Sequence, residues 1–183
     1  MTAPGSLGLP EKMVAVHHAL ADAGVHHAFG GALALAWCTQ RARGTIDLDV
    51  NVFLHPDRSE EVLAALPTEV LADDDGRALL ARDGQARLWW DQTPIDLFLN
   101  TTAFHEAVAD RVRWEPFADH ELPFLSCDDL AVFKAFFNRT KDWADLEEMR
   151  DAGTLDIATV AGVLVHHLGA DDERIARLRS LAS

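Results

Sequence analysis

The sequence predicts an α+β fold, with a small mixed β-sheet, flanking helices and a helical C-terminal segment. Up to about residue 125, short runs in which apolar and polar residues alternate are interspersed with segments whose apolar residues recur every three or four positions. From residue 126 onward only the helical pattern is found. We therefore expect an α/β core over residues 1–125 and a helical segment over residues 126–183 that packs on this core to give a single compact unit.

Expected helices and strands alternate in the first part of the chain. A helix is expected over "LPEKMVAVHHALADAG", where apolar residues have helical spacing and a glycine ends the segment. "VHHAF" is a short strand that runs into Gly30 and Gly31, and "ALALAWCTQRA" is a second helix. In "GTIDLDVNVFL" the alternation is strict, as in a strand. Its two faces are Ile46, Leu48, Val50 and Val52 on one side and Asp47, Asp49 and Asn51 on the other.

After residue 55 the pattern predicts a helix over "DRSEEVLAAL", then a loop over the acidic, glycine-containing "ADDDGRALLARDG". "ARLWW" and "IDLFLN" form a hairpin around the turn "DQTP", with Asp96 on the polar face of the second strand. A helix capped by Thr101 or Thr102 follows, then a short strand over "ELPFLS". Ser126 and Asp129 make a capping box that begins a helix, and the rest of the chain is helical.

Composition narrows the classes of function. The formal net charge of −14 disfavours a long nucleic acid as ligand, because such a surface repels phosphate backbones. No apolar run approaches the roughly 18 residues of a membrane span, and no signal peptide is apparent, so we expect a cytoplasmic protein. Cys38 and Cys127 are expected to be buried free thiols, with a disulfide as the alternative.

Three aspartates are the candidate chemical groups. Asp47 and Asp49 are two residues apart on an expected strand, so both carboxylates leave the same face, about 7 Å apart at the backbone. Asp96 would complete a three-carboxylate cluster if its strand is a neighbour. Carboxylate oxygens are the ligands that hard divalent cations prefer, and three of them can hold two metal ions for in-line displacement at phosphorus. We therefore expect a site for Mg²⁺, or for Mn²⁺ in its place, at Asp47, Asp49 and Asp96.

Gly30 and Gly31 lie between an expected strand and an expected helix. Without side chains they let backbone N–H groups approach a phosphate, and the N-terminus of the helix adds a favourable partial charge. Either motif alone is a weak signal. The order and spacing of the glycines and the three aspartates are much more specific, and together they predict a site for a nucleoside triphosphate and its metal ions.

The run G-G-x-A-L at Gly30 and Gly31, followed by R-x-T-x-D-x-D from Arg43 to Asp49, resembles the polymerase-beta-type nucleotidyltransferase superfamily. "TPIDLFL" matches the strand of that superfamily that carries the third carboxylate. "DDLAVFKAFFNRTKDWADLEEM" resembles the helical segment of lincosamide nucleotidyltransferases and of abortive-infection-type nucleotidyltransferase toxins. The similarity covers roughly residues 12 to 150. Many members have Gly-Ser at the turn where this chain has Gly31, so a hydroxyl contact is absent here.

The resemblance implies a nucleotidyltransferase fold and a role for each matching residue. Asp47, Asp49 and Asp96 would bind the metal ions, and Asp96 would also act as base or orienter for the acceptor hydroxyl. The nucleotide-binding residues would be Gly30, Gly31, Arg43, Thr45, Lys134, Arg139 and Lys141. For Arg43 and Thr45, at the approach to the metal strand, a structural cap is an equal alternative to a phosphate contact. Asp142 and Asp145 would pair with the basic residues of the later segment. Independently of the resemblance, the tryptophans are expected to be packing residues. The alternative is that Trp89 or Trp90 lines an acceptor pocket, since consecutive strand residues face opposite sides.

The expected activity is transfer of a nucleoside monophosphate from an NTP, ATP among the candidates, to an acceptor hydroxyl, with release of pyrophosphate. The favoured acceptor is a small molecule such as an antibiotic, which suits the acidic surface. One alternative is a toxin-type enzyme that modifies RNA or protein and is controlled by an antitoxin. The other is a non-catalytic module of the same fold that binds nucleotide or a partner. The expected partners are the NTP and the acceptor, with no membrane partner. A homodimer and an antitoxin complex both stay open, because the sequence does not set the oligomeric state.

Overall fold

The computed structural model of the chain describes residues 7–182 and divides into two compact units. The first unit comprises residues 7–30 and 44–124, and the second comprises residues 31–43 and 125–182. The second boundary falls within one residue of the expected one. The sequence did not indicate that residues 31–43 leave the first unit and belong with the helical one.

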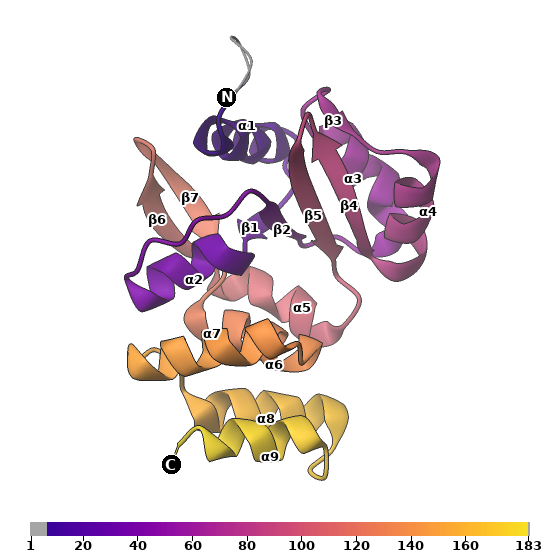
Figure 1. Ribbon diagram of the computed structural model, residues 1–183. Coiled ribbons are helices and arrows are strands. Elements are labelled where there is room, and N and C mark those ends of the chain that lie inside the picture. Colours follow the sequence, from indigo (N-terminus) through magenta and orange to yellow (C-terminus); the bar gives the residue numbers. More distant parts are fainter. Residues whose placement is uncertain (1–6, 183) are drawn as a thin grey trace. The chain divides into compact units, whose positions relative to one another are not determined.

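A seven-stranded mixed sheet forms the first unit (Figure 1). The strands follow the spatial order β3-β4-β5-β2-β1-β7-β6, and β2 pairs in parallel with β5 while β4 and β5 form an antiparallel hairpin. This agrees with the small mixed sheet that the sequence predicts. The strands are β1 (His27–Phe29), β2 (Leu48–Val52), β3 (Val70–Leu71), β4 (Gln85–Trp90), β5 (Thr93–Leu99), β6 (Arg113–Phe117) and β7 (His120–Phe124).

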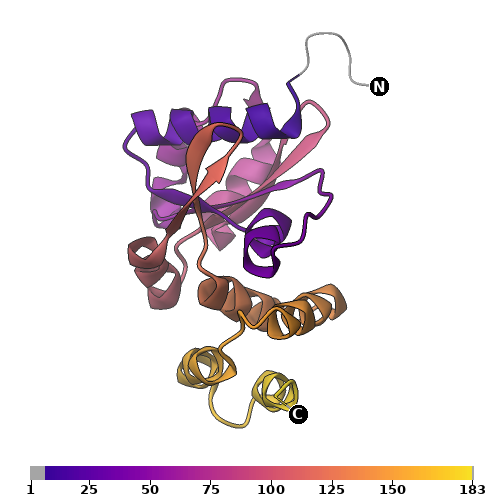
Figure 2. The same cartoon turned by 90° about the vertical axis from the view of Figure 1, so that its left-hand side faces the viewer.

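Helices cover one face of this sheet. The inward residues of β2, β4 and β5 are fully or almost fully buried apolar side chains, such as Val50, Leu88 and Leu97. Helix α4 packs against β4 and β5, α3 packs against α4, and α1 contacts α3 and β7 (Figures 1 and 2). The helices of this unit are α1 (Leu9–Asp22), the 3-10 turn η1 (Pro56–Arg58), α3 (Ser59–Ala65), α4 (Asp74–Asp83), α5 (Ala103–Val108) and the 3-10 turn η2 (Ala109–Arg111).

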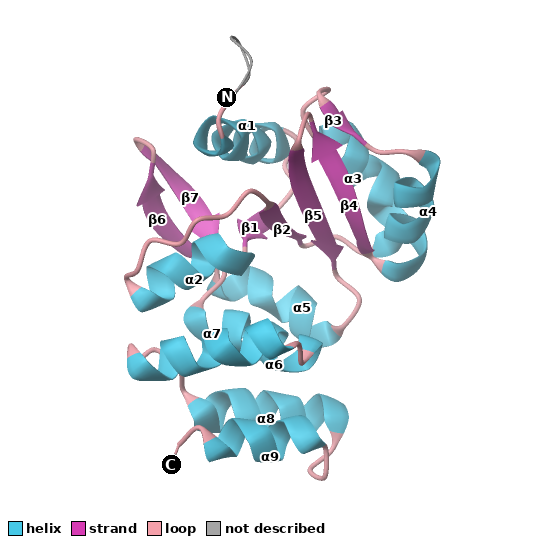
Figure 3. Cartoon of the chain, in the orientation of Figure 1, coloured by secondary structure: helices cyan, strands magenta, loops and turns pink. Residues whose placement is uncertain are grey.

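The second unit is entirely helical where the structure describes it (Figure 3). Its helices are α2 (Gly31–Thr39), α6 (Cys127–Phe137), α7 (Thr140–Asp151), α8 (Ile157–Leu168) and α9 (Glu173–Ser180). Helix α2 packs against α6 and α7, and α6 packs against α8 and α9. The Ser126 hydroxyl accepts a hydrogen bond from the Asp129 N–H at 3.2 Å, which confirms Ser126 as the cap of α6. Within residues 7–182 no helix is both long enough and apolar enough to cross a membrane.

A buried lysine fixes the turn of the β4–β5 hairpin. The Lys12 side chain is 3% exposed, and its ammonium group donates to the carbonyl oxygen of Trp90 at 2.9 Å and to the hydroxyl of Thr93 at 3.0 Å. It also pairs with the carboxylate of Asp91 at 3.2 Å. An ammonium has three protons to donate, so these three acceptors satisfy it fully, as a buried cation requires. Helix α1 thereby holds residues 90–93 in one conformation.

Four sequence expectations in this unit were wrong. The acidic segment expected to be a loop forms α4, because the Asp73 carboxylate caps it at the N–H of Gly76 (2.7 Å) and Gly84 ends it with a φ of 68°. Strands β3 and β6 were not expected. Strand β2 begins at Leu48, so Ile46 is 75% exposed instead of facing the core. The hairpin turn consists of residues 91 and 92 alone, since Trp90 pairs with Thr93.

The two cysteines form a disulfide, so the expectation of free thiols was also wrong. Cys38 lies near the end of α2 and Cys127 is the first residue of α6, and their Cα atoms are 5.6 Å apart. The packing of α2 against α6 brings these two positions together across a sequence separation of 89 residues. The bond joins the two chain segments from which the second unit is built.

Three buried histidines, His17, His27 and His105, carry depressed pKa values. Nδ1 of His27 lies 3.0 Å from the Val25 carbonyl oxygen, and its Nε2 lies 3.0 Å from Nδ1 of His17. With neutral rings, His27 donates to Val25 and accepts from His17. Burial lowers the pKa of His27 to about 4, and the neighbouring His17 charge acts in the same direction. Burial likewise lowers the pKa of His105, on α5, to about 4.

Acid should therefore destabilise the first unit before its carboxylates titrate. An unfolded histidine takes up its proton near pH 6.5, whereas the folded His27 and His105 do so near pH 4. The stability that the neutral rings contribute is complete above pH 6.5 and is lost as the pH falls from there towards 4. Urea unfolding should show a loss of up to about 2 kcal/mol per histidine between pH 7 and pH 5.

The variant His27→Gln should lose about half of this pH dependence, whatever its stability at pH 7. The neighbouring exposed residue provides the control, since His26→Gln should keep the full dependence. An unchanged pH dependence in His27→Gln would show that this histidine does not titrate as described.

Reduction of the disulfide should destabilise the protein. A cross-link between residues 38 and 127 restricts the unfolded chain, and bonds of this kind typically contribute about 2–4 kcal/mol. We expect the variant Cys38→Ser/Cys127→Ser, and the wild type in dithiothreitol, to unfold at lower urea concentrations. Dithiothreitol should have no effect on the double variant. Labelling of two thiols in the unreduced, denatured wild type would contradict the presence of the bond.

Candidate active site

Strand pairing places two of the three candidate aspartates side by side. Asp49 on β2 and Asp96 on β5 are direct partners in the parallel register of these strands. Neighbouring strands lie about 4.8 Å apart, and paired residues project from the same face of a sheet. Both side chains are partly buried, while the residues next to each in sequence, such as Leu48 and Ile95, are fully buried on the opposite face. The sheet thus presents a pair of carboxylates on the face that carries the polar residues.

Asp47 lies just before β2, two residues from Asp49. The Thr45 hydroxyl donates a hydrogen bond to the Asp47 carboxylate, and the Asp47 N–H lies 3.3 Å from the same hydroxyl oxygen. Thr45 was expected either to contact a phosphate or to act as a structural cap. Here it holds the first of the three aspartates in a fixed conformation at the entry to the strand.

Arg87 on β4 is a member of this site that the sequence did not indicate. It is the direct partner of Asp96 in the antiparallel register of β4 and β5. Its Nε and Nη2 atoms donate to the two carboxylate oxygens of Asp96, each at 2.7 Å. The hydrogen bond and charge of Asp96 raise the pKa of Arg87, and the charges of Asp47 and Asp49 add to this. The guanidinium group therefore lies in the field of all three carboxylates.

Apolar side chains extend the same face towards the edge of the sheet. Trp89 is two residues from Arg87 on β4 and is 45% exposed, and its cross-strand partner Leu71 on β3 is 67% exposed. Trp90 faces the core and is only 4% exposed. Of the two tryptophans considered for an acceptor pocket, Trp89 is thus the one on the carboxylate face.

The donor chemistry of the three aspartates fits a hard divalent cation, which takes oxygen ligands. Within residues 7–182, however, no group of three or more His, Cys, Asp or Glu side chains is gathered closely enough to hold a metal ion. Asp96 is the carboxylate whose two oxygens are taken by Arg87. The strands place Asp49 and Asp96 on one face, whereas Asp47, which was expected within the strand, lies just before it. The three side chains are not closed around a common centre.

The glycine pair joins the first unit to the second. The Gly30 N–H donates to the Asp49 carbonyl at 2.9 Å, which extends the β1–β2 ladder by one residue beyond Phe29. This N–H is therefore used within the sheet and does not point to a phosphate in this conformation. Gly31 has a φ of 56°, in the left-handed region where a side chain is disfavoured. Backbone geometry alone thus accounts for glycine instead of serine at residue 31.

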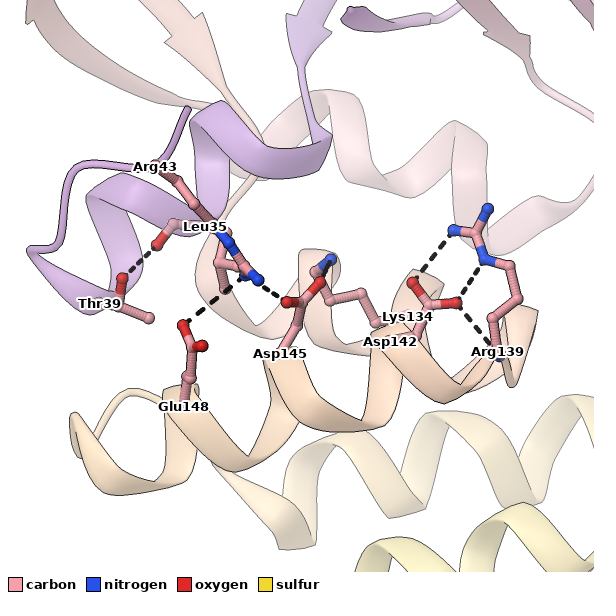
Figure 4. A network of polar contacts seen from close by, with 8 residues as sticks. All are labelled: Leu35, Thr39, Arg43, Lys134, Arg139, Asp142, Asp145 and Glu148. Carbon is pink, nitrogen blue, oxygen red and sulfur yellow. Dashed lines mark hydrogen bonds and ion pairs between the residues drawn. The ribbon is translucent and has the colours of Figure 1, made fainter. Parts of the chain in front are cut away.

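Arg43, Lys134 and Arg139, three of the expected phosphate-binding residues, are engaged in ion pairs within the second unit (Figure 4). Asp145 on α7 accepts from Lys134 on α6 at 2.6 Å, and both side chains are buried. Its other oxygen accepts from Arg43, which also lies 3.7 Å from Glu148. The hydrogen bond to Asp145 raises the pKa of Arg43. Asp145 thereby connects α6 and α7 with residues 31–43 inside the second unit.

An ion pair also stabilises the start of α7. Arg139 donates through Nε and Nη2 to the carboxylate of Asp142, at 2.6 and 3.0 Å, and Asp142 also accepts from the Arg139 N–H at 3.2 Å. The expected pairing of Asp142 and Asp145 with basic residues is confirmed. Lys141 is exposed on α7. A role for Lys134, Arg139 and Lys141 in phosphate binding stays a prediction.

Solved structures share this fold. The antibiotic-resistance nucleotidyltransferase ANT(2'')-Ia aligns with 93% of this chain and 88% of its own, at a TM-score of 0.52 and 15% identity. An antigenic nucleotidyltransferase-like protein from Paracoccidioides brasiliensis aligns with 93% of this chain and 92% of its own, at a TM-score of 0.50 and 12% identity. The chain has the nucleotidyltransferase fold. No protein-family model and no curated protein sequence matches it.

The conformation of Gly31 gives a direct test of the turn. Because an alanine in the left-handed region is strained, Gly31→Ala should lower the free energy of unfolding by about 1–2 kcal/mol. Gly44→Ala is the matched control: its φ is outside the left-handed region, and an added Cβ meets no atom within 4 Å. The control should be neutral or slightly stabilising. Equal effects of the two substitutions in urea unfolding would contradict the described turn.

Proposed function

We propose that the chain is a metal-dependent nucleotidyltransferase that moves a nucleoside monophosphate from an NTP to an acceptor hydroxyl and releases pyrophosphate. The observation that carries the proposal is the register of β2 and β5, which sets Asp49 beside Asp96 on the exposed face with Asp47 two residues away. A sheet that needed only to be buried would gain nothing from adjacent like charges, which repel. The nucleotidyltransferase fold of the chain also supports the proposal.

Each aspartate has a proposed task. Asp47, Asp49 and Asp96 would hold Mg²⁺ or Mn²⁺, which supplies Lewis-acid stabilisation of the triphosphate when bound. The acceptor oxygen forms a bond to the α-phosphorus as the bond from that phosphorus to the pyrophosphate oxygen breaks, and pyrophosphate leaves with the electron pair. Asp96 orients the acceptor hydroxyl and takes its proton. The chain therefore contributes mainly positioning and electrostatics.

A small hydroxylated molecule such as an antibiotic is the proposed acceptor. With 30 acidic and 16 basic residues, the chain repels a polyanion such as RNA, and Trp89 offers an exposed aromatic surface on the carboxylate face. An RNA or protein acceptor is the alternative, and pyrophosphate release in the presence of each acceptor class distinguishes them. We also propose that Lys134, Arg139 and Lys141 contribute to neutralising the triphosphate.

A thermal-shift titration tests the metal and nucleotide site. Each NTP is added with and without Mg²⁺ to the wild type and to Asp47→Ala/Asp49→Ala. One NTP, at about 100 times its Kd, should stabilise the wild type by about 2.7 kcal/mol and raise Tm by about 5–10 °C only when Mg²⁺ is present. The double variant should lose this shift, although removing two negative charges favours an anionic ligand electrostatically.

The variant Glu60→Ala/Glu61→Ala is the matched control, since it removes the same two charges from exposed positions of α3. It should keep the full metal-dependent shift. If no NTP stabilises the folded wild type in the presence of Mg²⁺ or Mn²⁺, the proposed activity is wrong, and the fold serves a binding function instead.

A further inference from the structure

The Asp96 carboxylate is occupied by a cation that belongs to the chain itself. Arg87 and Asp96 face each other directly across β4 and β5, and both oxygens of Asp96 accept hydrogen bonds from the guanidinium group at 2.7 Å. Such a paired geometry is among the strongest ion-pair arrangements in proteins. The Asp96 side chain is only 16% exposed, so water screens the pair on one side only. Asp96 is thus neutralised without a metal ion.

The other two aspartates contribute to the same local field. The charges of Asp47 and Asp49 stabilise the Arg87 guanidinium in addition to its contact with Asp96. The positive charge of Arg87 therefore offsets part of the repulsion among the three carboxylates. A divalent cation at these carboxylates would do the same, but it would meet the positive charge of Arg87 at close range, where like charges repel strongly.

We propose that Arg87 is a positioning residue that competes with a divalent cation for the Asp96 carboxylate, an inference that rests on the proposed function. In the free protein Arg87 holds Asp96. Metal binding at the three aspartates displaces Arg87, and the triphosphate that accompanies the metal then becomes the nearest anion for its guanidinium. Arg87 is 51% exposed, so the end of its side chain has the freedom for this exchange.

The inference predicts effects of opposite sign on two ligands. Without Arg87, Asp96 is free for the metal, so Arg87→Gln should bind Mn²⁺ alone about tenfold more tightly than the wild type, the factor for one charge-assisted pair. The same variant should bind the Mn²⁺ complex of the NTP less tightly, because the phosphate contact is lost. Mn²⁺ binding is measured by electron paramagnetic resonance of the free ion, with the full chain and no acceptor present.

Two further variants separate competition from a change of net charge. Arg82→Gln removes an arginine that forms an equivalent two-point ion pair with Asp83 on α4, at 2.8 and 2.6 Å, and it should leave the Mn²⁺ affinity within about twofold of wild type. Arg87→Lys keeps the charge but cannot bind both carboxylate oxygens in the same way. Competition predicts an intermediate gain for Arg87→Lys, whereas a pure charge effect predicts the wild-type affinity.

The outcomes separate this inference from the proposed function. Tighter Mn²⁺ binding in both Arg87 variants but not in Arg82→Gln supports competition. Equal binding by the wild type and both Arg87 variants leaves the metal site intact and overturns the competition. Binding by none of the folded proteins overturns both. If Arg87→Gln does not fold, Arg87→Lys decides, together with the Nε–H resonance of Arg87 in the wild type, which must shift on addition of Mg²⁺ for the inference to hold.

Discussion

The first unit depends on how neighbouring carboxylates on one sheet are kept compatible with folding. The parallel pairing of β2 and β5 fixes the backbones of Asp49 and Asp96 at adjacent positions, so their charges cannot separate without breaking the sheet. A protonated carboxyl or a cation is needed, and Arg87 supplies the cation from the next strand. These charged side chains are concentrated on paired strands, where the backbone is most rigid. Such rigidity is what a catalytic centre that acts by positioning requires.

Several features away from the carboxylates maintain this geometry. A shift of one residue between β4 and β5 would turn Arg87 to the other face of the sheet. Lys12 opposes such a shift, since it binds the carbonyl of Trp90 and the hydroxyl of Thr93 at the two ends of the turn. The buried lysine of α1, which looks unrelated to the chemistry, therefore fixes which cation meets Asp96. Thr45 likewise fixes the conformation of Asp47 through its hydroxyl group.

Hydrophobic alternation was enough to predict the central strands and the face that carries Asp49 and Asp96, because burial of every second residue leaves a clear period of two. It failed where burial does not alternate. Strand β6 is largely exposed, and its turn to β7 uses Ala118 and Asp119 with φ values of 47° and 62°, a conformation that asparagine or glycine would have signalled.

The same limits explain why Arg87 was missed. A four-residue turn after Trp90 would have placed Arg87 opposite Phe98, whereas the observed two-residue turn places it opposite Asp96. The contact with Lys12 that shortens the turn comes from far away in the sequence, as does the packing that joins Cys38 with Cys127. Local sequence patterns do not indicate contacts between residues that are far apart in the sequence.

The route of the chain through the two units also sets an order of events during synthesis. Helix α2 leaves the ribosome early, but the helices against which it packs, α6 and α7, are complete only at residue 151. At typical translation rates of about 5–20 residues per second that interval is about 5–20 s. The last strand of the sheet, β7, is complete at residue 124, so the sheet has roughly 1–5 s to form while α2 is still without its complete neighbours. Cys38 cannot form its disulfide for most of this delay, because Cys127 is the only other cysteine in the sequence. The native disulfide can therefore form only after synthesis has passed Cys127, when the first strands and helices have already been made.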